Sequence, residues 1–323
     1  MARVETFLTD QARTRPDAPA LTDSLGTAWS YADLDAASDA FAAQLQTAGV
    51  QANDRVLMLS ENCASAVAVL FACWKLDAVV IPVNARQTAG EITRILNHAA
   101  PAAVVMTCAA SKAAAAHAER LDATEVSGAF GSLHIATPLP SAPDSDLHDV
   151  AVLLYTTGTT GDPKGVMLTH DNLRFGGAAS ANLRDMRQDD LIYGVLPITH
   201  VFGLASVVTA SCYIGATVRM EARFTAAKLF EALQDGVTLL SAVPQMHARL
   251  MQYTKEQGLV TLGSEQLRYV SSGAAPLDPA WKRKAEAFYG VALQNGYGMT
   301  ESTAGICATR NEIGNPDISV GPP

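Results

Sequence analysis

The stretch Val152-Leu153-Leu154-Tyr155-Thr156-Thr157-Gly158-Thr159-Thr160-Gly161-Asp162-Pro163-Lys164-Gly165 joins an apolar segment to a loop rich in threonine and glycine. The apolar segment predicts a buried strand that runs directly into the loop. Backbone N–H groups, threonine hydroxyls and the Lys164 ammonium can converge there on an oxyanion, so the loop predicts a polyphosphate site. It is not the usual P-loop, because Pro163 stands where that motif needs glycine and Gly165 where it needs serine or threonine. On this stretch alone, a surface turn with a solvated lysine is an equal alternative.

Short apolar segments alternate with amphipathic segments on both sides of this loop. Strands are predicted at residues 55–59, 78–83, 103–106, 152–155, 191–196, 238–243, 267–270 and 291–294, with helices between most of them. Ser30 predicts a helix cap, and Thr88 with Glu91 predicts a capping box. This order predicts an α/β fold of mostly parallel sheets covered by helices. The proline-containing segment 138–149 predicts a linker between subdomains 1–137 and 150–323.

Composition narrows the class of protein. The chain has 323 residues, 49% of them hydrophobic and 17% charged, which is typical of a globular protein with a sizeable core. Its net charge of −9 argues against nucleic acid or an anionic membrane surface as the main partner. The five scattered cysteines, the dispersed histidines and the lack of a signal-peptide pattern predict a cytoplasmic protein without a zinc site. Residues 201–218 carry no charge, but their glycines and hydroxyls favour a buried helix and a core strand over a membrane span.

Three further segments follow predicted strands, and the carboxyl ends of strands are where open α/β folds bind ligands. They are Pro197-Ile198-Thr199-His200, Ser271-Ser272-Gly273-Ala274-Ala275-Pro276-Leu277 and Gln294-Asn295-Gly296-Tyr297-Gly298-Met299-Thr300-Glu301-Ser302. With the threonine- and glycine-rich loop, they resemble in order four motifs of the adenylate-forming (AMP-binding) enzymes, which include acyl-CoA synthetases, aryl-CoA ligases and peptide-synthetase adenylation domains. Before residue 149 the resemblance rests mainly on the order of elements. It implies an acyl-CoA synthetase-like large N-terminal domain made of two sheet-helix subdomains.

The resemblance also implies a reaction and its residues. ATP would activate a fatty or aryl carboxylic acid as an acyl-adenylate with release of pyrophosphate, and CoA would then accept the acyl group. Catalytic roles are implied for Lys164, Thr300, Glu301 and His200, with Glu301 as the Mg²⁺ ligand. The implied nucleotide-binding residues are Thr156, Thr157, Gly158, Thr159, Thr160, Gly161, Lys164, Ser272, Gly273, Ala274, Ala275, Asn295, Gly296, Tyr297, Gly298, Met299 and Thr300. Taken singly, Tyr297 and Thr300 are also ordinary packing or capping residues.

The uncharged residues near His200 are implied to border the acyl pocket. The implied pocket residues are His200, Val201, Phe202, Val243 and Met246. Burying an unpaired substrate ammonium against such side chains would be costly, so an amine-free aliphatic or aryl acid is expected. Without the resemblance, a histidine after an apolar strand is more often a satisfied core residue than a catalyst.

The chain ends at Ser319-Val320-Gly321-Pro322-Pro323, within what resembles a further segment of the family. We therefore expect a fragment, natural or trimmed, that lacks the small C-terminal domain with its catalytic lysine and is nearly inactive alone. One alternative is an adenylation domain that loads an acyl or amino acid onto a carrier protein. A non-catalytic nucleotide-binding protein is disfavoured because Lys164 and Glu301 are present. The identity of the acid, the oligomeric state and the acceptor stay open.

Overall fold

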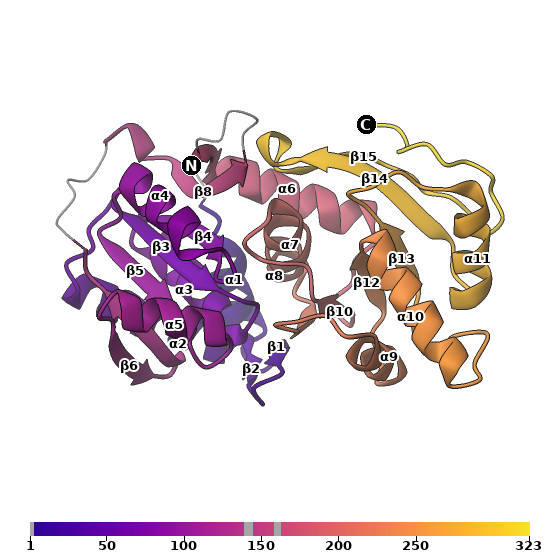
Figure 1. The fold of residues 1–323 in the computed structure, drawn as a ribbon, viewed down its shortest axis with the longest axis horizontal. Helices are drawn as coiled ribbons and strands as arrows, with labels where there is room; N and C mark the ends of the chain where they lie inside the picture. Colours follow the sequence, from indigo (N-terminus) through magenta and orange to yellow (C-terminus); the bar gives the residue numbers. More distant parts are fainter. Residues whose placement is uncertain (1–2, 139–144, 158–162) are drawn as a thin grey trace.

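The computed structural model describes the chain except residues 1–2, 139–144 and 158–162, and its strands form two sheets (Figure 1). The eight-stranded sheet has the order β15-β14-β13-β12-β10-β11-β1-β2. Its strands are β1 (Pro19–Asp23), β2 (Ala28–Ser30), β10 (Leu191–Gly194), β11 (Thr217–Met220), β12 (Leu239–Ala242), β13 (Tyr269–Ser272), β14 (Leu293–Met299) and β15 (Ala304–Ala308). Neighbouring strands run parallel except at the two edges, where β2 and β15 are antiparallel to β1 and β14.

The seven-stranded sheet has the order β6-β7-β5-β3-β4-β8-β9. Its strands are β3 (Arg55–Ser60), β4 (Val79–Asn84), β5 (Ala103–Met106), β6 (Thr124–Gly128), β7 (Gly131–Ala136), β8 (Val150–Thr157) and β9 (Pro163–Thr169). The central strands β5, β3, β4 and β8 are parallel, whereas β6, β7 and β9 form antiparallel edges. The predicted α/β fold with mostly parallel sheets is confirmed. The antiparallel edge strands are additions that the apolar pattern did not predict, because a strand such as β6 is largely exposed and polar.

Helices connect most of the parallel strands. They are α1 (Thr6–Thr14), α2 (Tyr31–Thr47), α3 (Ala64–Lys75), α4 (Ala89–Ala99), α5 (Lys112–Arg120), α6 (His170–Leu183), α7 (Val201–Gly203), α8 (Ala210–Ile214), α9 (Ala226–Gln234), α10 (Pro244–Glu256) and α11 (Pro279–Tyr289). The short turns η1 (Ser145–Leu147) and η3 (Thr300–Ser302) are 3₁₀ helices, and η2 (Leu204–Thr209) is a π-helix. The predicted cap at Ser30 and capping box at Thr88 are confirmed.

The uncharged segment 201–218 forms α7, η2 and α8 and then enters β11, as the sequence predicted. In the described part of the chain, no helix combines the length and the apolar character needed to cross a bilayer.

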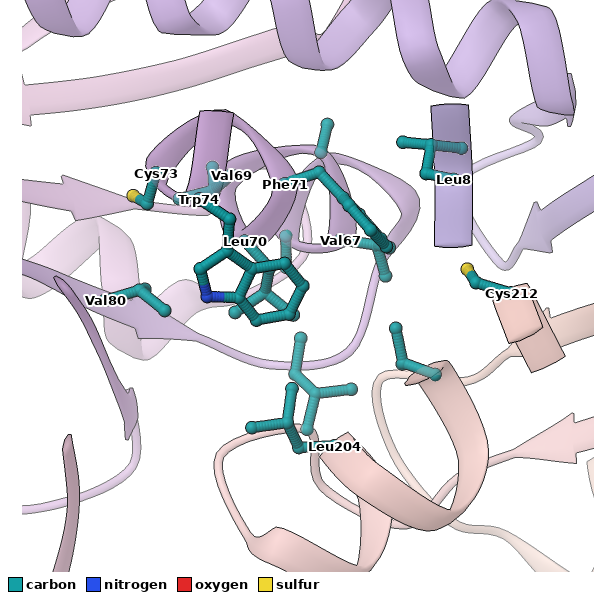
Figure 2. Close-up of a cluster of buried hydrophobic side chains, with 14 of the residues drawn as sticks. Leu8, Val67, Val69, Leu70, Phe71, Cys73, Trp74, Val80, Leu204 and Cys212 are labelled. Atoms are coloured by element: carbon teal, nitrogen blue, oxygen red, sulfur yellow. The ribbon is translucent and has the colours of Figure 1, made fainter. Parts of the chain in front are cut away.

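One hydrophobic core extends across both sheets. Trp74 on α3 is fully buried, and its indole Nε1 donates a hydrogen bond to the Ala151 carbonyl of β8 at 2.9 Å. Figure 2 shows Leu70 beside this ring and Leu204, from the segment between β10 and β11, on the opposite side of the cluster, while Cys212 from the same segment lies near Leu8. Helix α3 is apolar on all its faces, and such a helix has to be covered on every side. Elements from both sheets cover it, so the two sheets share this core.

Each of the two sheets contains strands from both sides of the predicted linker. The hairpin β1–β2 comes from the start of the chain but pairs with β11 in the eight-stranded sheet. The hairpin β8–β9 follows the linker but pairs with β4 in the seven-stranded sheet. Helix α6 follows β9 of the seven-stranded sheet and packs against η2, α8 and β15 of the other part of the chain. In Figure 1 it lies above α7 and α8. The division into subdomains at residues 138–149 stays a prediction.

Candidate active site

The carboxyl ends of strands from both sheets border one cleft of about 350 Å³. The seven-stranded sheet contributes residues at the ends of β3 and β4, and the eight-stranded sheet contributes residues that follow β10, β11 and β12. The lining residues are Ser60, Glu61, Asn62, Asn84, Arg86, Val195, Pro197, Thr199, Ala222, Arg223, Phe224, Val243, Gln245, Met246 and Arg249. The predicted pocket residues Val243 and Met246 lie here, at a place where α/β folds bind ligands.

Three arginines at this cleft were not predicted. Arg223 Nε and Nη2 donate to the two carboxylate oxygens of Glu61 at 3.0 and 3.2 Å, and Arg86 Nε lies 3.4 Å from the nearer oxygen. The Glu61 side chain is 1% exposed, whereas those of Arg86 and Arg223 are 54% and 57% exposed. Hydrogen bonding to this carboxylate raises the pKa of Arg223.

Arg249 on α10 is exposed and makes no ion pair with any described residue. The arginines outnumber the one carboxylate among them, so the mouth of the cleft is positively charged and suits an anionic ligand. The signal that could have revealed Glu61 and Arg86 in the sequence is their place just after two predicted strands.

The Pro-x-x-His turn leads from β10 into α7. His200 caps α7, and its Nδ1 accepts a hydrogen bond from the Phe202 backbone N–H at 3.2 Å. The neutral ring therefore carries its proton on Nε2 and can donate it to a ligand. His200 is partly open to solvent, but desolvation by the surrounding protein still lowers its pKa. The lowered pKa favours this neutral form. The turn is tight, because a Cβ at Gly203 would come within 2.2 Å of the Pro197 carbonyl oxygen.

Phe202 connects the predicted acid pocket with the predicted nucleotide segment. A Cβ added at Gly273 would come within 3.3 Å of the Phe202 ring, so the ring leaves little room for a side chain at this position. The guanidinium of the buried Arg184 lies 5.9 Å from the centre of the same ring, a neighbour that the sequence did not predict. Val201 is instead buried in the shared core. The structure therefore does not gather all five predicted pocket residues around one cavity.

The ends of the predicted phosphate loop are strand residues rather than loop residues. Thr156 and Lys164 are register partners across the β8–β9 hairpin, because the antiparallel ladder extends further than the apolar pattern indicated. The predicted residues Gly158, Thr159, Thr160 and Gly161 lie outside the described residues, and of Thr157 only the backbone is described.

Strand β9 lies against η3, which holds Thr300 and Glu301. The Lys164 and Glu301 side chains are exposed, whereas Thr300 is buried. Two predicted motifs that are far apart in the sequence are therefore neighbours in the fold.

The predicted adenine-side segment begins where β13 ends. The Ser272 hydroxyl is buried and has no hydrogen-bond partner in the described part of the chain. Such a hydroxyl is costly unless a ligand or water supplies the missing partner. Gly273 follows, and Ala274 has a left-handed backbone (φ 65°), a strained conformation of the kind found at ligand sites. Ala275 beside it is exposed.

Strand β14, the neighbour of β13 in the eight-stranded sheet, carries the remaining predicted residues. A Cβ at Gly298 would lie 1.8 Å from the Ala304 carbonyl oxygen, so only glycine fits beside β15. Tyr297 is 53% exposed, which leaves its ring available for stacking, and Met299 is exposed as well. The Asn295 side-chain amide already has a protein partner, because its Nδ2 donates to the Ser319 carbonyl at 3.0 Å. Gly296 is the next residue of β14.

Comparisons with known proteins agree with this arrangement. A family model described as AMP-binding enzyme matches residues 8–323. Feruloyl-CoA synthase of Amycolatopsis sp is 32% identical over 298 residues, which are 92% of this chain and 59% of that protein. The chain thus spans somewhat more than half the length of this relative.

Two solved structures extend the comparison. Apo MatB from Rhodopseudomonas palustris superposes with a TM-score of 0.81 at 27% identity, covering 99% of this chain and 64% of that one. The N-terminal domain of FACL13 from Mycobacterium tuberculosis superposes with a TM-score of 0.79 at 26% identity, covering 95% of this chain and 78% of that one. The family and the N-terminal-domain fold that the motifs predicted are confirmed.

Proposed function

The chain belongs to the AMP-binding enzyme family, and we propose that it activates a carboxylic acid with ATP, forming an acyl-adenylate and releasing pyrophosphate. The observation that supports this most is the packing of β9 against η3, which brings Lys164 and its partner Thr156 to the same region as Thr300 and Glu301. An ammonium, hydroxyls and a carboxylate in one region suit a triphosphate and its Mg²⁺.

The described residues fit a nucleotide in two further ways. The orphaned Ser272 hydroxyl offers a buried hydrogen bond, and the exposed Tyr297 ring offers a stacking face. No described group of three or more His, Cys, Asp and Glu side chains could hold a metal ion, so Glu301 would share Mg²⁺ with phosphate and water oxygens.

Each site residue has a proposed part in the reaction. Bound ATP would supply the α-phosphorus that the acid attacks. Lys164, Thr156 and residues 157–161 would hold the terminal phosphates and so make pyrophosphate a better leaving group. The Thr300 hydroxyl would contact the α-phosphate. His200, held as the Nε2–H tautomer, would donate to the acid carboxylate and orient it.

The proposed acid is apolar and lacks an amine. Phe202 is the side chain between the His200 turn and Gly273, and it offers no hydrogen-bond acceptor or opposite charge to an ammonium group. The Arg184 guanidinium behind this ring would further repel a cation. The name of the feruloyl-CoA synthase relative is in keeping with an aryl acid.

The proposed acceptor is CoA. Its phosphates would be attracted to Arg86, Arg223 and Arg249, and the cleft that these arginines border also contains Val243 and Met246. A carrier protein as acceptor is the alternative, and it requires a binding surface for a protein rather than for free phosphates.

The test measures Mg²⁺-dependent ATP binding and acid-dependent exchange of pyrophosphate into ATP for residues 1–323. We expect ATP to bind, and exchange to be stimulated by aliphatic or aryl acids but to be slow, because the chain spans 59% of its relative. Exchange that prefers amino acids would favour the carrier-loading alternative. A chain that is folded but binds no ATP would contradict the proposal.

A further inference from the structure

Asn62 belongs to one sheet but makes its side-chain hydrogen bonds with the other. It follows β3 of the seven-stranded sheet and is 4% exposed. Its Nδ2 donates to the carbonyl oxygens of Gly194 and Leu196 at 2.9 and 2.8 Å. Its Oδ1 accepts from the Ile198 N–H at 3.0 Å. All three bonds go to the end of β10 and the start of the Pro197–His200 turn.

Only a carboxamide satisfies these three backbone groups together, because it offers two N–H donors and one acceptor. An aspartate would place a carboxylate oxygen against two carbonyl oxygens. An alanine would leave the Ile198 N–H and the Leu196 carbonyl without these partners in a buried place, at a cost of roughly 1–3 kcal/mol for each buried group left unsatisfied. The Gly194 carbonyl would keep the hydrogen bond that it accepts from the Glu221 N–H at 3.1 Å.

The other hydrogen bonds of this turn are internal. The His200 N–H donates to the Pro197 carbonyl at 3.0 Å, the Leu204 N–H donates to the His200 carbonyl at 3.0 Å, and His200 Nδ1 caps α7. These bonds hold the shape of the turn, but they do not set where it lies relative to β3. The bonds from Asn62 do so.

We infer that Asn62 is a positioning residue for the acid-binding turn, because its side chain fixes the position of the backbone that precedes His200. Asn62 also lines the cleft beside Pro197 and Thr199, so the same amide ties the two walls of the cleft together. The inference rests on the proposed role of His200 in holding the acid. It implies that loss of the amide impairs acid use far more than ATP use.

The experiment compares Asn62→Ala with Asn172→Ala. Asn172 is the control, because it is also an asparagine whose Oδ1 accepts a backbone N–H, from Thr169 at 3.0 Å, but it lies on α6 and does not line the cleft. Pyrophosphate exchange is measured with the acid that stimulates wild-type exchange most. We expect Asn62→Ala to raise the KM for the acid about tenfold and the KM for ATP less than about twofold. Asn172→Ala should change neither by more than about twofold.

A double-mutant cycle with His200→Ala separates positioning from a general loss of structure. If Asn62 acts through His200, adding Asn62→Ala to His200→Ala should cost little more, so that the effects are strongly non-additive. Additive effects, or equal losses for acid and ATP, would overturn the inference. Asn62→Ser, which keeps a small polar group, replaces the alanine variant if that variant does not fold.

A second readout needs no substrate. The imidazole C–H signal of His200, identified by its loss in His200→Ala, is followed by NMR against pH. Because desolvation by the surrounding protein lowers the pKa of the partly solvent-exposed His200, the wild-type midpoint should lie below the ordinary value, and Asn62→Ala should raise it toward that value by freeing the turn. An unchanged midpoint in folded Asn62→Ala would overturn the inference. If folded wild-type protein binds no ATP, the proposed function fails while this measurement still tests the positioning.

Discussion

Lys164 is the residue on which the proposed phosphate site most depends. Its side chain is exposed on β9, so its removal leaves no cavity and no buried partner unpaired. We expect Lys164→Ala to leave the free energy of unfolding nearly unchanged but to reduce pyrophosphate exchange by about 2–4 kcal/mol of transition-state stabilisation. Exposed Lys255 on α10 provides the control, and Lys255→Ala should alter neither quantity. An unaltered exchange rate in Lys164→Ala would exclude its proposed role.

Phe202 tests the acid pocket at the same scale. Its ring lies beside Gly273, so Phe202→Ala would open space between the His200 turn and the nucleotide segment. The change should shift exchange toward bulkier acids while ATP affinity stays nearly constant. Apolar pockets discriminate weakly, with one methylene worth roughly 1–3 kcal/mol, so graded rather than all-or-none rates are expected. Phe175, an exposed phenylalanine on α6, is the matched control. An unchanged order of preference among the acids would place the pocket elsewhere.

Among the elements, the β14–β15 hairpin offers a matched pair of glycines. Gly298 and Gly305 are register partners, but a Cβ at Gly298 would meet the Ala304 carbonyl, whereas a Cβ at Gly305 would meet nothing within 4 Å. Gly298→Ala should therefore lower the free energy of unfolding by about 1–3 kcal/mol and weaken ATP binding. Gly305→Ala should change stability by less than about 0.5 kcal/mol. Equal effects in denaturant unfolding would show that the close approach of β15 to Gly298 is not a constraint.

The central elements could be predicted from the sequence because their signals are local. Apolar runs marked β3, β4, β5 and β12, and hydroxyl caps marked α2 and α4. The edge strands could not, because a short strand such as β6 or β15 depends on its partner rather than on its own burial. For the same reason, the phosphate motif was predicted as a loop, although its two ends pair as β8 and β9.

At the scale of the whole molecule, the site depends on contacts that no motif contains. The motifs predicted sites at the ends of strands, where open α/β folds bind ligands, and β9 with Lys164 does lie against η3 with Glu301. They did not predict Glu61, Arg223 or Asn62, because these residues meet only when the two sheets pack together. The packing of the two sheets against each other therefore forms both the cleft and the shared core.

The shared core predicts that the two sheets unfold together. Leu204 in η2 is fully buried and faces the α3 core, which includes Trp74, although η2 lies between strands of the other sheet (Figure 2). Leu204→Ala should lower stability by about 2–5 kcal/mol through loss of burial and a residual cavity. In hydrogen exchange with added urea, amides of β4 in one sheet and β12 in the other should lose protection by the same amount, because one cooperative unit responds as a whole. If β12 weakened while β4 kept its wild-type protection, the chain would instead consist of two independently stable units.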